Sequence, residues 1–363
     1  MKVAVIGTGW ANTVQIPAFQ AGGLSVVGIY GRTRSKADSV AENHHVPFVA
    51  DTWQDLLSLD CDLISITSPP ALHVEQAQAV LAAGKHLLCE KPLTLTMAEA
   101  AVMRKLQEDY PHQLTLVDHE LRFVPVRLKA KELLEQGVLG RILTITIRIA
   151  RDIRMDPTKP WNWWSDASQG GGIMGAIGSH AIDGLLWLFA DVQTDDGTPL
   201  AHQLTMRGAS LGQVHPTRTS SDGEVKPVTA DDIASVTFNM GSAIGTMLIH
   251  GAALDGPIDL LTIRGTDGTL VLDNSLKLYW GKADGPLKEY VTPLPDNVPN
   301  RFRSSPFAAG TVLLGEALAE ASEDTSTPFT EHPRLANAAT LADGANVQTH
   351  LDAIYKLGGV NAT

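Results

Sequence analysis

The first 120 residues alternate short apolar runs with amphipathic segments. The apolar runs carry few polar residues, as expected for strands that are covered on both faces. They are Val3 to Ile6, Leu24 to Ile29, Leu63 to Ile66, Leu87 to Cys89 and Leu114 to Val117. Because parallel strands need crossover helices between them, this alternation predicts a parallel, doubly wound α/β sheet.

Helix signals lie between these runs. The amphipathic segment 72–83 ends at Gly84, which can adopt the left-handed conformation of a helix stop. Thr96 and Glu99 have the spacing of a capping box, which predicts a helix start. Pro17 interrupts the segment after the first apolar run, so we expect the helix there to be short or bent.

The pattern changes after about Arg122. A helix is predicted over Val126 to Gln136, and Ile142 to Ile149 then alternates apolar and polar residues strictly. Such alternation is typical of a sheet with one buried face and one face in contact with water. Further β-like runs are Ser235 to Asn239, Ala243 to His250, Leu260 to Arg264, Thr269 to Leu272 and Leu276 to Trp280. Two stretches rich in turn-forming residues, 212–232 and 296–305, are predicted as long loops.

Composition narrows the classes of protein. A chain of 363 residues exceeds what one compact core usually holds, so two domains are expected. The net charge of -12 disfavours a nucleic-acid or acidic-membrane partner, because both would be repelled. Neither a secretory leader nor an apolar run of membrane-spanning length is recognised in the sequence. The two cysteines and the scattered histidines lack metal-ligand spacing, so we expect no metal site and a cytoplasmic protein.

A glycine turn follows the first predicted strand. In a dinucleotide fold such glycines permit a tight turn and a close approach of the backbone to the pyrophosphate. Here Gly7 and Gly9 are present, but Asn12 stands at the third position. A simple turn is the alternative, and the strand-turn-helix context favours the cofactor. The predicted contacts at this turn are Gly7, Thr8, Gly9, Trp10, Ala11 and Asn12.

The end of the second strand bears on the choice between NAD and NADP. An acid there would bind the ribose hydroxyls of NAD, but the segment 30–36 contains none. Arg32 offers a planar fork suited to the 2'-phosphate of NADP. The sequence therefore favours NADP, with NAD possible, bound by Gly31, Arg32, Thr33 and Lys36. The alternative is that these charges are solvated at the start of a helix.

A lysine follows the fourth apolar run, in the tripeptide Glu90-Lys91-Pro92. A lysine at the carboxyl end of a parallel strand can reach a substrate oxygen beside a nicotinamide ring. A surface lysine is the alternative. With the glycine turn, the tripeptide predicts an α/β Rossmann domain over residues 1–121. An α+β domain with a mostly antiparallel sheet follows over 122–363, with a C-terminal helix that can pack back on the first domain.

Several motifs together resemble the glucose-fructose oxidoreductase / inositol dehydrogenase family (GFO/IDH/MocA), over nearly all of the chain. Besides the glycine turn and Glu90-Lys91-Pro92, the matching motifs are Thr67 to His73, Arg122 to Pro125, Gly170 to Gly172, Gly178 to His180 with Asp183, and Ile263 to Thr269. Each motif is modest alone, and their order and spacing are specific.

The resemblance implies a Rossmann domain and an α+β domain whose sheet forms oligomer contacts, hence a homo-oligomer (dimer or tetramer). It implies that Lys91 faces the nicotinamide and the substrate, and that His180 is the acid/base residue. The further cofactor contacts that it implies are Thr67, Ser68, Pro69, His73 and Glu90.

One position departs from the family pattern. Family members often carry an Asp four residues before the histidine, and this chain has Ala176 there. Asp183 could replace that carboxylate, since i,i+3 spacing also brings it near His180 on a helix. Looser candidates are Asp166, Asp152 and Glu120.

Aromatic and charged residues mark the expected substrate site. Aromatic faces beside polar side chains suit a polyhydroxylated ring, although tryptophans also pack at domain junctions. The predicted substrate-binding residues are Lys91, Arg122, Arg151, Trp163, Trp164, His180 and Asp183. The sequence thus predicts an NAD(P)-dependent dehydrogenase or reductase acting on a secondary alcohol or carbonyl of a sugar, polyol or sugar-like substrate. Two alternatives are a non-catalytic dinucleotide-binding sensor or partner subunit, and a nicotinamide-dependent lyase or glycosidase without net redox change.

Overall fold

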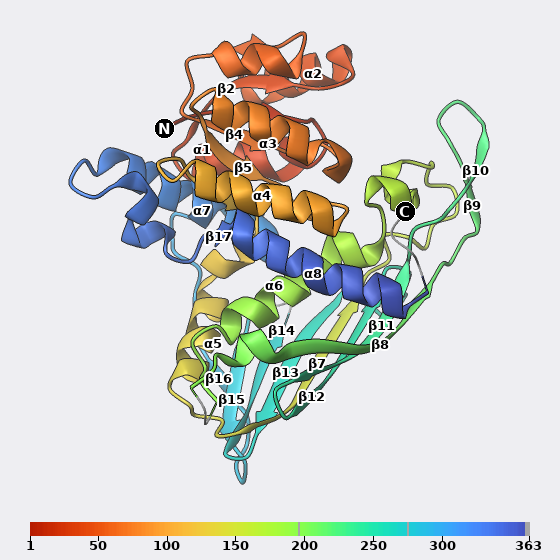
Figure 1. Cartoon of the computed structure of the whole chain (residues 1–363), viewed down its shortest axis with the longest axis vertical. Coiled ribbons are helices and arrows are strands. Elements are labelled where there is room, and N and C mark those ends of the chain that lie inside the picture. The colour runs from red at the N-terminus through yellow and green to blue at the C-terminus, as the bar shows by residue number, and fades with distance from the viewer. Residues whose placement is uncertain (195–196, 274–275, 360–363) are drawn as a thin grey trace. The chain divides into compact units, whose positions relative to one another are not determined.

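The structure, a computed structural model, describes residues 1–194, 197–273 and 276–359 (Figure 1). The chain forms two compact units. The first contains Met1–Val124 and Leu294–Asn346, and the second contains Pro125–Pro293 and residues 347–359. Residues 294–346 thus belong with the first unit, whereas the sequence analysis placed them in the second domain. The difference arises because strand β17 (Ala339–Thr340) and helix α7 (Pro306–Glu323) pack within the first unit.

The first unit contains a seven-stranded sheet in the order β17-β6-β5-β4-β1-β2-β3. Its strands besides β17 are β1 (Lys2–Ile6), β2 (Ser25–Tyr30), β3 (Phe48–Val49), β4 (Leu63–Ile66), β5 (His86–Cys89) and β6 (Thr115–Val117). All pairs are parallel except β17 with β6, which confirms the predicted doubly wound sheet. The chain order reverses between β1 and β4, and ligands bind such sheets at the carboxyl ends beside this switch point.

Helices cover both faces of this sheet. They are α1 (Ile16–Ala21), α2 (Arg34–His44), α3 (His73–Ala82), α4 (Met97–Asp109) and α7. Side chains alternate along β1, so Val3 and Val5 pack with Phe19 of α1 and with α7, while Ala4 and Ile6 pack with α3 and α4. Figure 1 shows α3 and α4 running side by side across the strands. Burial on both faces explains why these strands are apolar runs rather than alternating patterns.

The local helix signals hold in this unit. Thr96 and Glu99 form the expected capping box at the start of α4, and Gly84 is left-handed after α3. After the glycine turn, a π-helix (Ala11–Gln15) leads into the six-residue α1, whose first turn contains Pro17. The predicted short helix is confirmed, because proline is tolerated only where its missing N–H is not needed.

The second unit contains an eight-stranded sheet in the order β16-β15-β14-β13-β7-β12-β11-β8. The strands are β7 (Ile142–Ala150), β8 (Leu204–Gly212), β11 (Ile233–Met240), β12 (Ala243–His250), β13 (Ile258–Gly265), β14 (Gly268–Asp273), β15 (Leu278–Lys282) and β16 (Lys288–Tyr290). All pairs are antiparallel except β12 with β7, so the mostly antiparallel sheet is confirmed. The alternation predicted for Ile142 to Ile149 is present from Thr144 to Ile149 of β7, where buried side chains alternate with less buried ones, and the same alternation runs along β11 and β12.

The stretch 212–232 is not one continuous loop. It contains a hairpin of β9 (Thr217–Thr219) and β10 (Val225–Pro227), joined by a turn at Ser220 to Gly223 (Figure 1). The prediction was wrong here because the strands are only three residues long and their polar composition resembles a loop. The helices of this unit are α5 (Pro125–Glu135) and α6 (Ser179–Leu188), and α8 (Leu341–Leu357) begins in the first unit and ends in the second. Across the described chain, no helix is both long and apolar enough to cross a membrane.

Two glycines in α7 give a matched test of packing in the first unit. A Cβ on Gly310 would lie 2.5 Å from the backbone oxygen of Glu120, whereas a Cβ on Gly315 would meet its nearest atoms at 3.5 Å. We predict that Gly310→Ala lowers the free energy of unfolding by ~1–3 kcal/mol through overpacking. Gly315→Ala should be neutral or stabilising by up to about 1 kcal/mol, because alanine favours the helix. Urea unfolding of both variants measures this, and equal stability of the two would contradict the packing of α7 described above.

Candidate functional site

The glycine turn lies between β1 and the π-helix, at the carboxyl edge of the first sheet. Gly7 has a φ of 125°, and its N–H donates to the carbonyl of Tyr30 at 2.8 Å. A Cβ there would collide with Thr67, so position 7 requires glycine. A Cβ on Gly9 would meet none of the described atoms within 4 Å. The open space beside Gly9 is the kind of cradle in which a pyrophosphate can approach the backbone, so the turn fits a dinucleotide.

The remaining residues of the turn divide between surface and packing roles. Trp10 is exposed and Ala11 is fully buried. The side-chain oxygen of Asn12 lies 2.9 Å from Nε2 of His44 on α2. Asn12 therefore joins the start of the π-helix to α2, where the usual third glycine would only allow close packing.

Three cations follow β2 closely, Arg32 in the loop and Arg34 and Lys36 in the first turn of α2, and the structure distinguishes them. Arg34 binds Asp38 one turn along α2 at 2.8 Å and also binds Asp51. Within the described chain, Arg32 and Lys36 form no ion pair, and both are exposed. Arg32 is thus the arginine of this loop whose guanidinium is available to a ligand. Gly31 is buried between Thr8 and Ala37, and Thr33 precedes α2 in an extended conformation.

The loop after β4 is tied to the loop after β5 by His73. The ring of His73 is fully buried, with Nε2 lying 2.8 Å from the carbonyl oxygen of Ser68 and Nδ1 lying 3.1 Å from that of Leu93. Burial lowers the pKa of His73 and so favours the neutral ring. Thr67 donates its hydroxyl to the carbonyl of Ile6 at 3.0 Å, and the Ser68 hydroxyl donates to Gln76 at 2.6 Å. His73 therefore acts on this edge of the sheet by fixing two loops.

Lys91 lies directly after β5 beside a group of buried acids. Gln15 of the π-helix donates one amide N–H to Glu90 at 3.1 Å and one to Asp118 at 2.7 Å. The hydroxyl of Ser65 on β4 donates to the side-chain amide oxygen (Oε1) of Gln15 at 2.8 Å. Gln15 thereby links three neighbouring strands at the edge that carries Lys91.

The acids of this group titrate abnormally. Burial, followed by the charge of Asp118, raises the pKa of Glu90 well above its ordinary range. Burial also raises the pKa of Asp118, and burial with both neighbouring acids raises that of Glu120. Among the described residues, no group of three or more His, Cys, Asp and Glu side chains could hold a metal ion.

The second unit places His180 and Asp183 on α6, and both are buried. Both lie within a regular α-helix, so their i,i+3 spacing puts them on one side of it. Ala176 instead lies in a π-helix (Met174–Gly178) that precedes α6. The chain between 176 and 180 therefore passes from a π-helix, which closes i→i+5 hydrogen bonds, into an α-helix.

A buried carboxyl anchors the start of that π-helix. Asp231 accepts the N–H of Met174 at 2.8 Å, and its backbone carbonyl accepts the N–H of Ile173 at 2.8 Å. The hydroxyl of Tyr355 donates to its other carboxyl oxygen at 3.5 Å. Burial raises the pKa of Asp231 to about 6.

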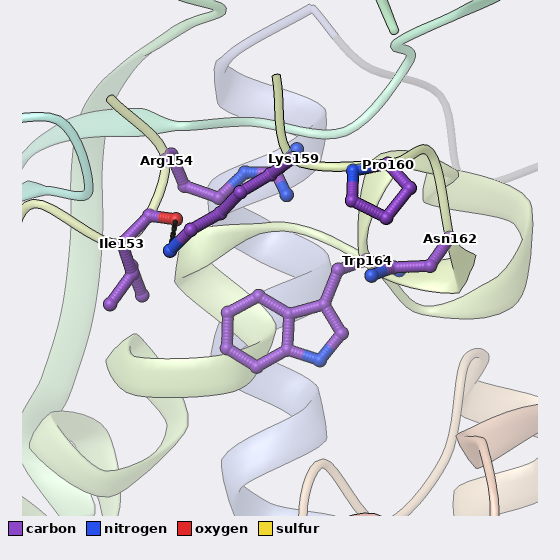
Figure 2. Close-up of a pocket in the computed structure, with 6 residues that line it drawn as sticks. All are labelled: Ile153, Arg154, Lys159, Pro160, Asn162 and Trp164. Atoms are coloured by element: carbon purple, nitrogen blue, oxygen red, sulfur yellow. Dashed lines mark hydrogen bonds between the residues drawn. The ribbon is translucent and has the colours of Figure 1, made fainter. Parts of the chain in front are cut away.

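A cavity of about 300 Å³ opens beside the tryptophan segment of the second unit. Figure 2 shows the indole of Trp164 on one side and the chain from Ile153 to Asn162 on the other. Lys159 crosses the cavity and donates to the carbonyl of Ile153 at 3.1 Å. Trp163 packs edge-on against Trp164, with ring centroids 5.8 Å apart. An aromatic face, an amide (Asn162) and an ammonium group make this cavity suited to a polyhydroxylated ligand.

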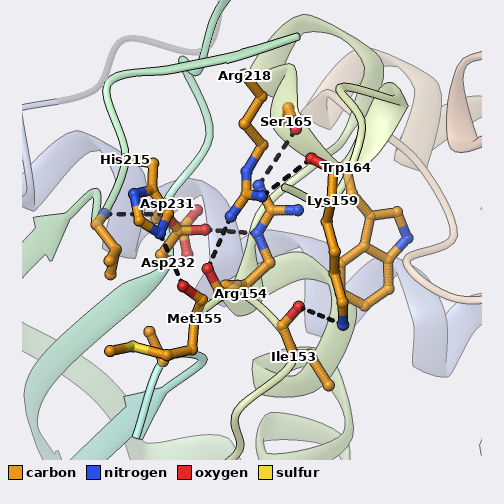
Figure 3. A network of polar contacts seen from close by, with 12 residues as sticks. Ile153, Arg154, Met155, Lys159, Trp164, Ser165, His215, Arg218, Asp231 and Asp232 are labelled. Atoms are coloured by element: carbon orange, nitrogen blue, oxygen red, sulfur yellow. Dashed lines mark hydrogen bonds and ion pairs between the residues drawn. The ribbon is translucent and has the colours of Figure 1, made fainter. Parts of the chain in front are cut away.

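A buried ionic network supports the cavity (Figure 3). Arg154 donates to Asp232 at 2.7 Å and to the hydroxyl of Ser165 at 3.2 Å. Arg218 of β9 donates to the backbone carbonyl of Arg154 at 2.7 Å and to that of Asp156 at 2.7 Å. The β9–β10 hairpin is thereby fixed against the segment that lines the cavity.

Two predicted substrate-binding residues, Arg122 and Arg151, form hydrogen bonds and ion pairs within the unit to which each belongs. Arg122 is buried and binds Asp343 at 3.4 Å. Arg151 donates to the carbonyls of Ala150 and Ile258 and binds Asp259 at 3.2 Å. These contacts give both arginines a structural role, and their contact with substrate stays a prediction.

The sequence analysis did not assign several residues that the structure places at these sites. Gln15, Asp118 and Arg218 carried no signal, because a glutamine in a helix, an acid after a strand and an arginine in a loop are common. Lys159 and Asn162 lie in the cavity wall next to the tryptophans that were recognised. Arg154 follows β7, and its pairing with Asp232 needs contact across 78 residues of sequence.

Comparisons with known proteins agree with this architecture. A sequence model of GFO/IDH/MocA oxidoreductases with an NAD-binding Rossmann fold matches residues 1–117, and a model of the C-terminal domain of that family matches 128–271. The "Uncharacterized oxidoreductase sll0816" of Synechocystis is 32% identical, over 92% of this chain and 90% of its own length. Glucose-fructose oxidoreductase domain-containing protein 1 of Xenopus tropicalis is 26% identical, over 98% of this chain and 89% of its own length. The structure of levoglucosan dehydrogenase with NADH and levoglucosan superposes with a TM-score of 0.81 at 22% identity, covering 99% of this chain and 97% of that one.

The carboxyl of Asp231 predicts a pH dependence of stability. Its pKa is raised in the folded state, so the folded protein keeps a proton that the unfolded chain loses, and stability falls as pH rises from about 4 to 6. A shift of this size corresponds to a loss of at most about 3 kcal/mol. We predict that Asp231→Asn becomes more stable relative to wild type by ~1–3 kcal/mol between pH 4 and pH 7.

Urea unfolding at several pH values measures this difference, and Asp222→Asn on the exposed hairpin turn is the control, which should show no such gain. If the difference in the free energy of unfolding between Asp231→Asn and wild type stays the same from pH 4 to pH 7, Asp231 is ionised in the folded protein over this whole range, and its pKa is not raised.

Proposed function

Because this chain belongs to the GFO/IDH/MocA family of oxidoreductases, we propose that it transfers a hydride between a nicotinamide cofactor and a secondary alcohol or carbonyl of a sugar, polyol or sugar-like substrate. The observation that carries the proposal is that the glycine turn and Lys91 lie at the same edge of the first sheet. The open glycine turn after β1 and Lys91 after β5 both stand at the carboxyl ends of the strands, beside the switch point. This is where open α/β sheets bind dinucleotides.

NADP is the proposed cofactor. Arg34 is neutralised by Asp38 and Asp51, while Arg32 is exposed beside the turn. The segment 30–36 carries no acid that would repel a 2'-phosphate. NAD remains the alternative, and the levoglucosan dehydrogenase structure contains NADH. Gly7, Thr8 and Gly9 would hold the pyrophosphate by backbone contacts, and Arg32 with Lys36 would hold the adenosine end.

The cofactor would supply the hydride acceptor or donor, and this chain would supply orientation and proton transfer. In the proposed mechanism Lys91 binds the substrate oxygen and stabilises negative charge that develops on it. His180 accepts the hydroxyl proton during oxidation and returns it during reduction. Asp183, on the same side of α6, is the proposed carboxylate that orients the imidazole.

The cavity beside Trp164 is the proposed contact for the sugar. The indole face would stack on C–H groups, while Asn162 and Lys159 would bind hydroxyls. The ligand of the levoglucosan dehydrogenase structure, an anhydrosugar, supports a substrate of this class.

We propose a homo-oligomer, dimer or tetramer, formed through the wet face of the eight-stranded sheet, where Ile244, Leu248 and Leu143 are exposed. The expected compartment is the cytoplasm, in keeping with two buried, unbridged cysteines.

The second candidate function is a non-catalytic dinucleotide-binding protein. The alanine at 176 favours it, because the usual carboxylate is missing, and the presence of Lys91 and His180 opposes it. A panel of sugars and polyols, with levoglucosan included, separates the possibilities. A dehydrogenase changes NADPH absorbance, a lyase or glycosidase consumes substrate without net reduction, and a binding protein does neither.

The first prediction of this proposal concerns Arg32. We expect Arg32→Ala to weaken NADPH binding by ~1–3 kcal/mol, the scale of a lost charge-assisted hydrogen bond, and to leave NADH binding nearly unchanged. Arg34→Ala is the matched control, since its guanidinium is already paired. Fluorescence titration of both cofactors measures the effect. A wild-type protein that prefers NADH, or equal losses for the two cofactors, would refute the role of Arg32.

The second prediction concerns Lys91. We expect Lys91→Ala to keep its fold and its affinity for NADPH while turnover on the identified substrate falls by about 10²–10⁴, the range for a positioned acid/base group. Lys105→Ala on the exposed face of α4 is the control. Steady-state kinetics with either nicotinamide cofactor measures turnover, and near-normal turnover of Lys91→Ala would show that this lysine is structural.

A further inference from the structure

The acids behind Lys91 form a buried pair whose two members touch the same amide. Glu90 follows β5 and Asp118 follows β6, and the parallel register pairs Cys89 with Val117, so the two acids stand next to each other. Gln15 donates one N–H to each of them. Asp118 is fully buried and Glu90 is 8% exposed. Two ionised carboxylates that share one neutral amide inside a protein would repel each other with little screening.

One proton between the two acids resolves this conflict. The carboxyl groups are within hydrogen-bonding reach of each other. Oxygen Oδ1 of Asp118 is buried without a hydrogen-bond partner among the described residues, so a proton carried by Glu90 would satisfy it. The opposite arrangement fits less well, because Asp118 accepts the short amide hydrogen bond at 2.7 Å, whereas Glu90 accepts two longer ones, from Gln15 at 3.1 Å and from the N–H of Lys91 at 3.2 Å.

We propose that Glu90 is a neutral acid that donates its proton to the carboxylate of Asp118, and that Asp118 is the buried counter-ion that keeps Lys91 charged. This inference rests on the proposed function, in which the charge of Lys91 polarises the substrate oxygen. Glu90 and Asp118 are then positioning residues, since they act through Lys91.

The electrostatics of the surrounding groups agree with this assignment. Burial and the neighbouring carboxylate raise the pKa of Glu90 well above its ordinary range, whereas hydrogen bonds from Gln15 and Glu90 oppose the effect of burial on Asp118. The charge of Lys91 lowers the pKa of both acids. The other titratable groups around the pair are Cys89, His119 and Glu120. Burial raises the pKa of the Cys89 thiol and that of Glu120, so both favour their neutral forms.

The proposal predicts unequal effects of two conservative variants. Glu90→Gln imitates the neutral acid and leaves the Asp118 charge in place, whereas Asp118→Asn removes that charge. The readout is the rate of acetylation of Lys91 by acetic anhydride at a series of pH values, followed by mass spectrometry on the cofactor-free protein. We expect the pH of half-maximal reactivity to be unchanged in Glu90→Gln. In Asp118→Asn it should fall by about one unit or more, because a lost opposite charge disfavours the ammonium form.

Infrared spectroscopy tests the proton itself. At neutral pH the wild-type spectrum should contain the C=O band of a protonated carboxylic acid that Glu90→Gln loses, and the exposed Glu75→Gln control should not change this band. Equal falls in the acetylation midpoint for both variants, or no band lost in Glu90→Gln, would overturn the proposal. If Asp118→Asn does not fold, Glu90→Gln still decides the matter through its band and its midpoint. Neither measurement uses a substrate, so failure here is distinguishable from failure of the proposed dehydrogenase activity.

Discussion

The buried amide of Gln15 is the contact on which the candidate site of the first unit depends. It accepts from Ser65 on β4 and donates to Glu90 after β5 and to Asp118 after β6. A glutamine amide has two N–H donors and one acceptor oxygen, and here each makes one of these hydrogen bonds. Ser65, Glu90 and Asp118 are therefore all held within hydrogen-bonding distance of the π-helix. Because the same helix begins at the glycine turn, the position of Lys91 and the position of the nucleotide cradle are coupled through one side chain.

In the second unit, a buried ion pair connects the segments around the candidate cavity, as Gln15 connects the strands of the first unit. Arg154 and Asp232 are both almost fully buried, and breaking such a pair leaves an uncompensated charge in the interior. Arg154 lies in the segment after β7, and Asp232 directly precedes β11, so the pair joins the segments that flank these two strands, next to the tryptophan segment. The cavity wall is therefore built on a rigid sheet although its residues lie in irregular structure.

The parts that the sequence predicted are those with a local signal. Apolar runs predicted five strands of the first sheet, because burial on both faces leaves few polar positions in them. The capping box at Thr96 and the stop at Gly84 depend on only a few neighbouring residues. The polar strands β9 and β10, the two-residue β17 and the partners of Gln15 depend on contacts between distant segments, which no single window of sequence contains. Residues of the site were recognised by type, as with Lys91 and Trp164, and their supporting contacts were not.

The missing carboxylate at 176 is better understood from the shape of the chain around it. The segment before His180 is a π-helix (Met174–Gly178), so the backbone between positions 176 and 180 is not one regular α-helical turn. A carboxyl group is nevertheless close to this segment, since Asp231 accepts the N–H of Met174 and its own backbone accepts that of Ile173. Asp231 fixes the start of the π-helix, and Asp183 lies beyond it on the same helix as His180. Asp231 therefore has a structural task at the start of this π-helix, and the task of orienting the imidazole of His180 is the one proposed above for Asp183.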